Sequence, residues 1–374
     1  MDARRPAAGR AAGRADEGER VEQARIAGIG VAFPPTVLVQ RDVLGMLPEG
    51  HAHREVLRRV LAGSGIVRRR MVIDPRREDV STWSTADRMR RFQQDALPLA
   101  VTAVSTALSR AAVDPRDVGM LCVVSSTGYG TPGVDTRLIR DLGMRPGTQR
   151  LAVGHMGCFA ALPGLAACTD FVRGHARPAV LLNVELSSLH LQPPPWDVEQ
   201  FVVNTLFGDA AVAMVVRADG RAEGVGPALR VLETASYTDH GHEDHMTWEV
   251  GDTGFLMGLS SKVPGLIAAR LPEVVGGLLE PHGLTLGDVR WWAVHPGGPR
   301  IIDAAEEGLG LAPELTADSR RVLAEYGNCS SAGLPIVLAE LLHTGAGAPV
   351  AGAHGVAMTF GPGLTLYTAL LLGE

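Results

Sequence analysis

The chain has 374 residues, of which 46% are hydrophobic and 20% are charged, and its formal net charge is −6. This composition predicts a globular, enzyme-sized protein with a large core in one or two domains. The negative charge excludes a generally basic surface, so neither nucleic acid nor an anionic membrane is an expected partner.

Residues 1–24 mix arginine, alanine, glycine and acids without apolar periodicity, and they predict a disordered tail. After this tail, apolar runs typical of strands alternate with helical ones. Strands are predicted at 24–33, 118–126 and 179–188, and helices at 97–111 and 159–174. This alternation is typical of an α/β protein with buried sheets.

Two features of the sequence recur at the same spacing and indicate an internal duplication. Asp117 and Asp288 both precede an apolar strand, and they are 171 residues apart. Cys158 and Cys329 both begin a segment of small residues, and they are also 171 residues apart. We therefore predict two similar α/β halves, over residues 25–230 and 231–374.

An apolar stretch, a histidine cluster and the four cysteines bear on whether the chain spans a membrane, binds a metal or forms disulfides. The uncharged stretch 355–373 is long enough to span a bilayer, but Gly361–Gly363 breaks it into two buried strands joined by a turn. His240, His242 and His245 lie among acids, yet without a regular element to fix ligand geometry they predict a solvated loop and no metal site. The four cysteines lack C-x-x-C spacing and no charged-then-apolar leader precedes them, so we expect reduced thiols in the cytoplasm.

Cys158 stands at the expected start of a buried helix. The unpaired amides and dipole of such a helix stabilise a thiolate and lower its pKa from the free value of about 8.5. The alternative is a small buried side chain at a tight helix contact. His295, after an apolar strand, and Asn328, at the counterpart of Cys158, supply a base and a donor for covalent acyl transfer. Each also has a structural alternative, as a core histidine and as a helix N-cap.

Five motifs together resemble the type III polyketide synthases of bacteria, the chalcone synthase-like family. They are GHMGC at Cys158, VHPGGPRI at His295, YGNCSSA at Asn328, NTLFGDAA at Phe207 and FGPGL at 360–364. The resemblance runs from about residue 25 to the C-terminus. It implies the thiolase fold, with two duplicated α/β halves in a layered αβαβα arrangement, and a homodimer without a metal or redox cofactor.

The resemblance also implies a role for each member of the Cys158, His295 and Asn328 set. Cys158 carries the starter acyl group and then the growing chain as a thioester, and His295 keeps the thiol ionised. His295 and Asn328 hydrogen-bond the thioester carbonyl of malonyl-CoA and stabilise the enolate that forms when carbon dioxide leaves.

Further residues match the family's cavity and coenzyme A segments. The second gatekeeper position falls on Met257, so the plant pattern is broken there, and Trp248 falls where plant enzymes carry a small residue. His190 lines the pocket or caps a loop. The implied cavity residues are Phe207, Met257, Phe255, Trp248, His190, Ser330 and Thr131, which reaches the partner's cavity; those implied for coenzyme A are Arg68, Arg69 and Arg70.

The expected reaction is iterative decarboxylative condensation of malonyl-CoA onto an acyl-CoA starter, followed by cyclisation to a pyrone, resorcinol or related phenol. A flexible methionine at the gate favours a fatty acyl starter. Malonyl-CoA as its own starter, giving a tetrahydroxynaphthalene, stays open. A carrier-protein-dependent ketoacyl synthase and a non-catalytic acyl-binding protein are further alternatives; HPGGP and FGPG argue against the first, and the complete Cys/His/Asn set against the second.

Overall fold

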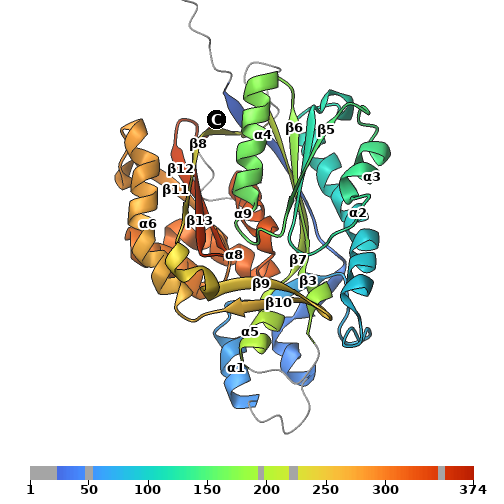
Figure 1. The fold of residues 1–374 in the computed structure, drawn as a ribbon. Coiled ribbons are helices and arrows are strands. Elements are labelled where there is room, and N and C mark those ends of the chain that lie inside the picture. The colour runs from blue at the N-terminus through green and yellow to red at the C-terminus, as the bar shows by residue number, and fades with distance from the viewer. Residues whose placement is uncertain (1–22, 47–53, 193–197, 219–225, 344–349) are drawn as a thin grey trace, which may run out of the picture.

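The computed structural model describes residues 23–46, 54–192, 198–218, 226–343 and 350–374 (Figure 1). Within these residues nine strands form one sheet in the order β11-β12-β13-β8-β1-β7-β6-β4-β5. The strands of its N-terminal half are β1 (Ala24–Ala32), β4 (Met120–Ser125), β5 (Gln149–Gly154), β6 (Ala179–Leu186) and β7 (Asp209–Ala218). Those of its C-terminal half are β8 (Leu229–Thr238), β11 (Val289–Val294), β12 (His354–Gly361) and β13 (Thr365–Gly373).

The strand order is symmetric about the junction of β8 and β1, apart from β5, which adds an edge strand to one side. From the middle outward, β1, β7, β6 and β4 on one side correspond in chain order to β8, β13, β12 and β11 on the other. The halves join where Arg25 pairs with Arg230 and Ile26 with Leu229. This topology confirms the two similar α/β halves predicted from the repeated spacing.

Helices form three further layers around the two halves of the sheet (Figure 1). Helices α4 (Ala161–His175) and α9 (Gly333–His343) lie between the halves and share one hydrophobic core with both of them. The outer faces are covered by α2 (Thr85–Arg110) and α3 (Val134–Asp141) on one side, and by α6 (Val263–Leu279) and α7 (Pro299–Leu309) on the other. Helix α9 buries nine of its 11 residues, as a helix that is apolar all round must. The layered αβαβα arrangement is as expected.

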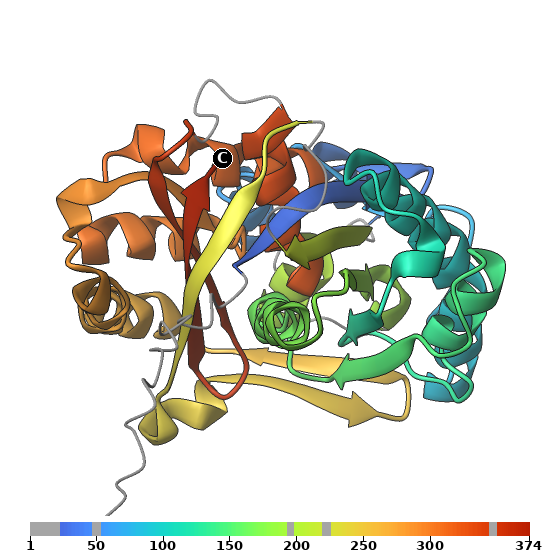
Figure 2. The same ribbon diagram turned by 90° about the horizontal axis from the view of Figure 1, so that it is seen from above.

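Smaller elements close one end of the two halves. The hairpin of β9 (Met246–Gly251) and β10 (Gly254–Leu259) crosses below both of them (Figure 2). Near it lie α1 (Arg54–Ala62) and α5 (Val198–Leu206), together with the pair β2 (Thr36–Val39) and β3 (Arg68–Met71). Helix α8 (Ala317–Tyr326) packs against both α9 and β3. These elements carry most of the side chains that surround the candidate site.

Most of the predicted elements are confirmed. The three predicted strands are β1, β4 and β6, the predicted helices lie within α2 and α4, and stretch 355–373 forms β12 and β13 around a turn. Of the predicted tail, 1–22 lies outside the described residues, and the boundaries of the halves stay a prediction. Among the helices described, none has the length and apolar character needed to cross a membrane.

Candidate active site

Cys158 lies in the turn that connects β5 to α4, three residues before the helix begins. Its side chain is buried, with 6% of its surface exposed. Gly157 adopts a φ of +83°, and a Cβ there would lie 2.4 Å from Cδ of Pro362, so only glycine fits beneath the FGPG turn. The backbone N–H of Gly157 donates to Ser126 Oγ at 2.8 Å. The turn is therefore held by both halves of the protein.

His295 follows the last residue of β11, where its N–H donates to the carbonyl of Met358 in β12 at 2.9 Å. Two glycines pack against its ring: a Cβ on Gly297 would lie 3.1 Å from Cδ2, and one on Gly333 would lie 3.2 Å from Nδ1. The ring is 2% exposed, and neither of its nitrogens has a hydrogen-bond partner. A buried imidazole without partners is poorly explained as structural, because burying an unpaired polar group is costly.

Asn328 lies at the junction of the two halves. It forms a parallel bridge with Phe207, and its N–H donates to the carbonyl of Leu206 at 3.0 Å. Its Oδ1 accepts from the N–H of Ser330 at 2.8 Å, which orients Nδ2 toward the carbonyl of Gly297 at 3.3 Å and toward the Cys158 thiol. The Asn328 side chain thus lies between the Cys158 thiol and the loop that follows His295.

A small cavity of about 20 Å³, the inner cavity, opens at Cys158. It has room for roughly one water molecule. Its lining residues are Ser126, Thr127, Gly157, Cys158, Ser187, Phe207, Trp248, Met257, Ser330 and Pro362. Of the predicted cavity residues, Phe207, Met257, Trp248 and Ser330 are therefore at this cavity, whereas Phe255, His190 and Thr131 are not among its lining residues.

His190 and Phe255 support the wall behind Trp248. The His190 ring stacks on Phe255 with centroids 4.2 Å apart, and its two nitrogens contact the carbonyl of Thr127 at 2.7 Å and the N–H of Phe255 at 3.0 Å. Burial lowers the pKa of His190 to about 4. His190 is thus a neutral packing residue and not a polar lining group. Trp248 is held by its own bond, from Nε1 to the carbonyl of Ser126 at 2.7 Å.

Glu185 is a residue that the sequence analysis did not single out. It is fully buried in β6, where it accepts from the N–H of Ser126 at 3.0 Å, from Thr127 Oγ1 at 2.7 Å and from Ser331 Oγ at 2.5 Å. Burial raises its pKa to about 7. The sequence signal that could have identified Glu185 is a single acid within an apolar strand run, because such a group is buried only when it is hydrogen-bonded.

A larger cavity of about 630 Å³, the outer cavity, lies between α1, α5, the start of α6 and the start of α7. Leu206 lines the outer cavity and its neighbour Phe207 lines the inner one. Gly297, two residues past His295, also lines the outer cavity, as does the basic residue Arg300. The two cavities therefore approach each other at Leu206 and Phe207.

The predicted coenzyme A arginines do not face the outer cavity. Arg69 points opposite to its neighbours, as expected in a strand, and is 1% exposed. Its guanidinium donates to Gln40 Oε1 and to two backbone carbonyls, and Arg69 is not among the residues that line the outer cavity. Arg68 pairs with Glu325 at the surface, and Arg70 is half-buried. Adjacent residues of one strand face opposite sides, so the three arginines do not all face one ligand, and their role in binding coenzyme A stays a prediction.

Desolvation dominates the electrostatics of the site. It raises the pKa of Cys158 to about 12, although hydrogen bonds from Ser330 and Asn328 act in the opposite direction. It lowers the pKa of His295 to about 3. Burial therefore acts against the thiolate that was expected at the helix start, and the thiolate stays a prediction. At neutral pH the site holds a neutral thiol and a neutral imidazole.

The histidine-rich loop makes local contacts. His242 pairs with Asp239 at 3.1 Å, and His245 pairs with Asp244 at 2.9 Å. In the portion of the chain that the structure describes, no group of three or more His, Cys, Asp or Glu side chains is placed to hold a metal.

Comparison with known proteins identifies what the chain is similar to. Family models of the chalcone and stilbene synthases match it over residues 13–220 for the N-terminal domain and 237–373 for the C-terminal domain. It is 35% identical over 354 residues to the alpha-pyrone synthesis polyketide synthase-like protein Pks18 of Mycobacterium tuberculosis, covering 91% of this chain and 89% of the relative. It is 31% identical over 344 residues to a 1,3,6,8-tetrahydroxynaphthalene synthase of Streptomyces griseus, covering 91% and 90%.

Solved structures agree with this similarity. The polyketide synthase PKS-I of the brown alga Ectocarpus siliculosus superposes with a TM-score of 0.88 at 30% identity, over 96% of this chain and 100% of that one. The C-terminal type III polyketide synthase domain of Steely1 from Dictyostelium superposes with a TM-score of 0.87 at 23% identity, over 94% and 99%. This is the thiolase-type fold that the sequence motifs implied.

The burial of the four cysteines generates a prediction for alkylation. Iodoacetamide is expected to label Cys158 first, because Cys122, Cys168 and Cys329 are 0% exposed. The labelling rate should rise about tenfold per pH unit above neutrality, because thiolate is the reactive form and the pKa of Cys158 lies far above pH 7. Peptide mass spectrometry at several pH values measures this rate. A rate that levels off below pH 7 contradicts the neutral thiol.

Proposed function

The chain belongs to the chalcone and stilbene synthase family, the type III polyketide synthases, and on this premise we propose that Cys158, His295 and Asn328 carry out its acyl transfer. It is an acyltransferase, and the Mycobacterium and Streptomyces proteins named above are its bacterial relatives. The observation that supports the assignment most strongly is the pair of unpartnered ring nitrogens on His295, a side chain that is 2% exposed. Such a group is poised to exchange a proton.

The first proposed step loads the starter acyl group. Neutral His295 accepts the proton of the Cys158 thiol as sulfur attacks the thioester carbonyl of an acyl-CoA. A bond forms between Sγ and the acyl carbon, the bond to the coenzyme A sulfur breaks, and the departing thiolate takes a proton from His295. The two ring nitrogens of His295 support this role, because neither is engaged by another hydrogen-bond partner and one of them can accept the proton.

The second step extends the chain. The thioester carbonyl of malonyl-CoA accepts hydrogen bonds from Asn328 Nδ2 and from a protonated ring nitrogen of His295. The bond to the carboxylate breaks, carbon dioxide leaves, and the enolate carbon attacks the acyl carbon on Cys158, which regains its thiolate. The fixed orientation of the Asn328 amide supports this role, because a preorganised donor in a dry site stabilises developing charge without reorganising.

The outer cavity is the proposed entrance for coenzyme A thioesters. Leu206 and Gly297 line it, and Arg300 at its wall offers a charge for a phosphate. No metal or redox cofactor takes part in the proposed steps. The cytoplasmic location stays a prediction.

Two classes of starter are proposed, and a different observation favours each. A fatty acyl-CoA is favoured by the flexible Met257 at the inner cavity, and a relative at 35% identity is named for alpha-pyrone synthesis. A short starter such as malonyl-CoA is favoured by the volume of the inner cavity, about 20 Å³ behind a Trp248 that is hydrogen-bonded in place. The starter that enters then determines whether cyclisation gives a pyrone, a resorcinol or a naphthalene product.

A homodimer is also proposed. Strand β5 is a sheet edge with exposed residues along its length, and Thr131 lies exposed outside the cavity of its own subunit. Pairing the edge with a second copy satisfies its free backbone groups. Light scattering on the purified chain should give twice its mass of 39.4 kDa, and a monomer at micromolar concentration contradicts the proposal.

The decisive experiment is a product assay. The purified protein is incubated with labelled malonyl-CoA and a panel of short, aromatic and long acyl-CoAs, and products are identified by mass. We expect carbon dioxide release and polyketides from the wild type, and none from Cys158→Ala, which cannot form the thioester. The matched control, Cys168→Ala, removes a buried thiol away from the inner cavity and should retain its products.

The same assay separates the alternatives. A wild type that is inactive with free coenzyme A thioesters but active with malonyl and acyl carrier proteins would favour a ketoacyl synthase. Polyketides that persist in Cys158→Ala would remove Cys158 from the mechanism.

Trp248 is predicted to limit the length of the bound chain. Trp248→Gly removes the indole that closes the inner cavity, so products should shift to longer chains and the relative rate with long acyl-CoA starters should rise about tenfold. Tyr129→Phe, at a residue that does not line the inner cavity, is the control. Unchanged product lengths in Trp248→Gly would show that the chain does not reach the indole.

A further inference from the structure

A third cavity, the Arg69 cavity, has no part in the proposed reaction. It measures about 380 Å³ and lies where β2, β3 and α5 meet the loop after Asp74. Such a volume is within the range of ligand sites, about 300–1,000 Å³. Much of its wall is apolar, formed by Leu38, Val43, Met46, Met71, Val80 and Leu191.

Asn204 lines this cavity with an unused donor. Its side chain is 8% exposed, and its Oδ1 accepts from the N–H of Gln192 at 3.4 Å and from Gln200 Nε2 at 3.0 Å. Its Nδ2 is buried and has no hydrogen-bond partner. A buried N–H₂ group without an acceptor is costly, and it is explained if a ligand supplies the acceptor.

Arg69 lines the same cavity beside Asn204. Its Nε donates to Gln40 Oε1 at 3.1 Å, and its Nη1 donates to the carbonyls of Asn204 and Phe207 at 3.1 and 2.7 Å. A guanidinium carries five N–H groups, and none of these bonds uses the N–H groups of Nη2. Asp209 supplies a nearby charge but accepts its own hydrogen bonds from Val72 and Ser188. Arg69 and Asn204, each with a donor that these bonds do not use, therefore line the same cavity.

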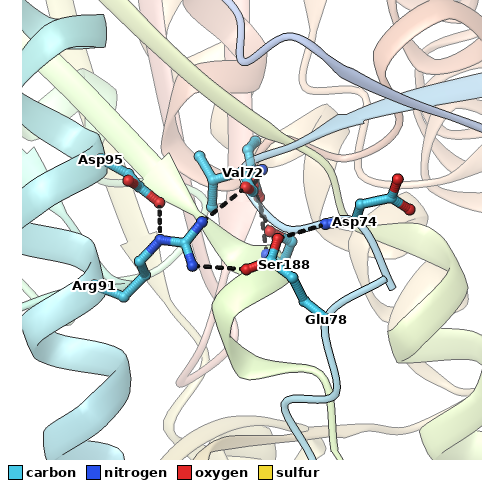
Figure 3. A network of polar contacts seen from close by, with 7 residues as sticks. Val72, Asp74, Glu78, Arg91, Asp95 and Ser188 are labelled. Atoms are coloured by element: carbon cyan, nitrogen blue, oxygen red, sulfur yellow. Dashed lines mark hydrogen bonds and ion pairs between the residues drawn. The ribbon is translucent and has the colours of Figure 1, made fainter. Parts of the chain in front are cut away.

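The acids at the rim are already engaged by cations. Glu78 accepts from Arg91 at 2.8 Å and from the N–H of Asp74 at 3.1 Å, within the polar network that joins α2 to this loop (Figure 3). Asp74 is paired with Arg76 at 2.7 Å, and both Arg76 and Arg77 lie at the rim. Asp79, a further acid there, accepts from the N–H of Ser81 at 2.9 Å. Arg76 and Arg77 both pair with Asp74, so Arg69, whose hydrogen bonds go to an amide and two carbonyls, is the cation that an anion in this cavity would meet.

We propose that the Arg69 cavity binds a carboxylate with an apolar body, such as a medium-chain fatty acid. The carboxylate accepts from Asn204 Nδ2 and Arg69 Nη2, and the chain lies against the apolar wall. Because Arg69 also holds the carbonyl of Phe207, an occupied site stiffens the segment that carries this residue.

The test is calorimetry on the full chain with sodium octanoate as the probe. Octanoate is expected to bind at one site per chain. Acetate lacks the apolar body and 1-octanol lacks the carboxylate, so each should bind about tenfold more weakly or less. Acyl-CoA turnover is not part of the readout, so the result does not depend on the proposed catalytic function.

Two variants locate the bound octanoate. Asn204→Asp keeps Oδ1 and the side-chain volume but replaces the donor with an oxygen, so binding should weaken about tenfold or more. Val80→Trp fills the apolar wall and should abolish binding while leaving both donors intact. The matched control, Val202→Trp, makes the same change in the outer cavity and should bind octanoate as the wild type does.

The proposal is overturned by any of three results. The first is that octanoate does not bind to the wild type. The second is that it binds equally well to Val80→Trp. The third is that it is lost from Val202→Trp instead, which would place it in the outer cavity. If Asn204→Asp does not fold, the two tryptophan variants still decide the outcome.

Discussion

The pairing of Phe207 with Asn328 is the interaction on which the site depends. It joins the segment before β7 in the N-terminal half to the segment before α9 in the C-terminal half. The carbonyl of Phe207 also accepts from the buried guanidinium of Arg69, and bonds to charged groups contribute about 1.5–3 kcal/mol. Without this junction, Asn328 would not be held beside Cys158, and neither half alone contains the complete set of proposed catalytic groups.

The site also excludes water. Cys158, His295 and Asn328 are all buried, and the inner cavity at Cys158 has room for roughly one water. Burial keeps the thiol and the imidazole neutral at rest, so ionisation is left to the moment when a thioester arrives. The same low polarity strengthens the hydrogen bonds that stabilise an enolate. Protection of the nucleophile and stabilisation of the intermediate thus have one physical origin.

The sequence predicted the structural features that depend on residues close together in the chain. Apolar runs identified the strands, and equal spacings of Asp117 to Asp288 and Cys158 to Cys329 indicated the duplication that the sheet order confirms. Side-chain direction and burial were harder to predict. Arg69 faces inward because strand neighbours alternate, His190 is saturated by backbone groups, and desolvation of Cys158 depends on residues distant in the chain. Such properties belong to the packed structure and leave little trace in the order of residues.

The central claim is that two halves place one set of donors around a substrate carbonyl next to Cys158. A crystal structure of the Cys158→Ala variant with malonyl-CoA bound tests it most directly. We expect the thioester carbonyl oxygen to lie about 3 Å from both Asn328 Nδ2 and a ring nitrogen of His295, with coenzyme A in the outer cavity. A carbonyl bound away from these two side chains, or a thioester that enters by another route, would contradict the claim.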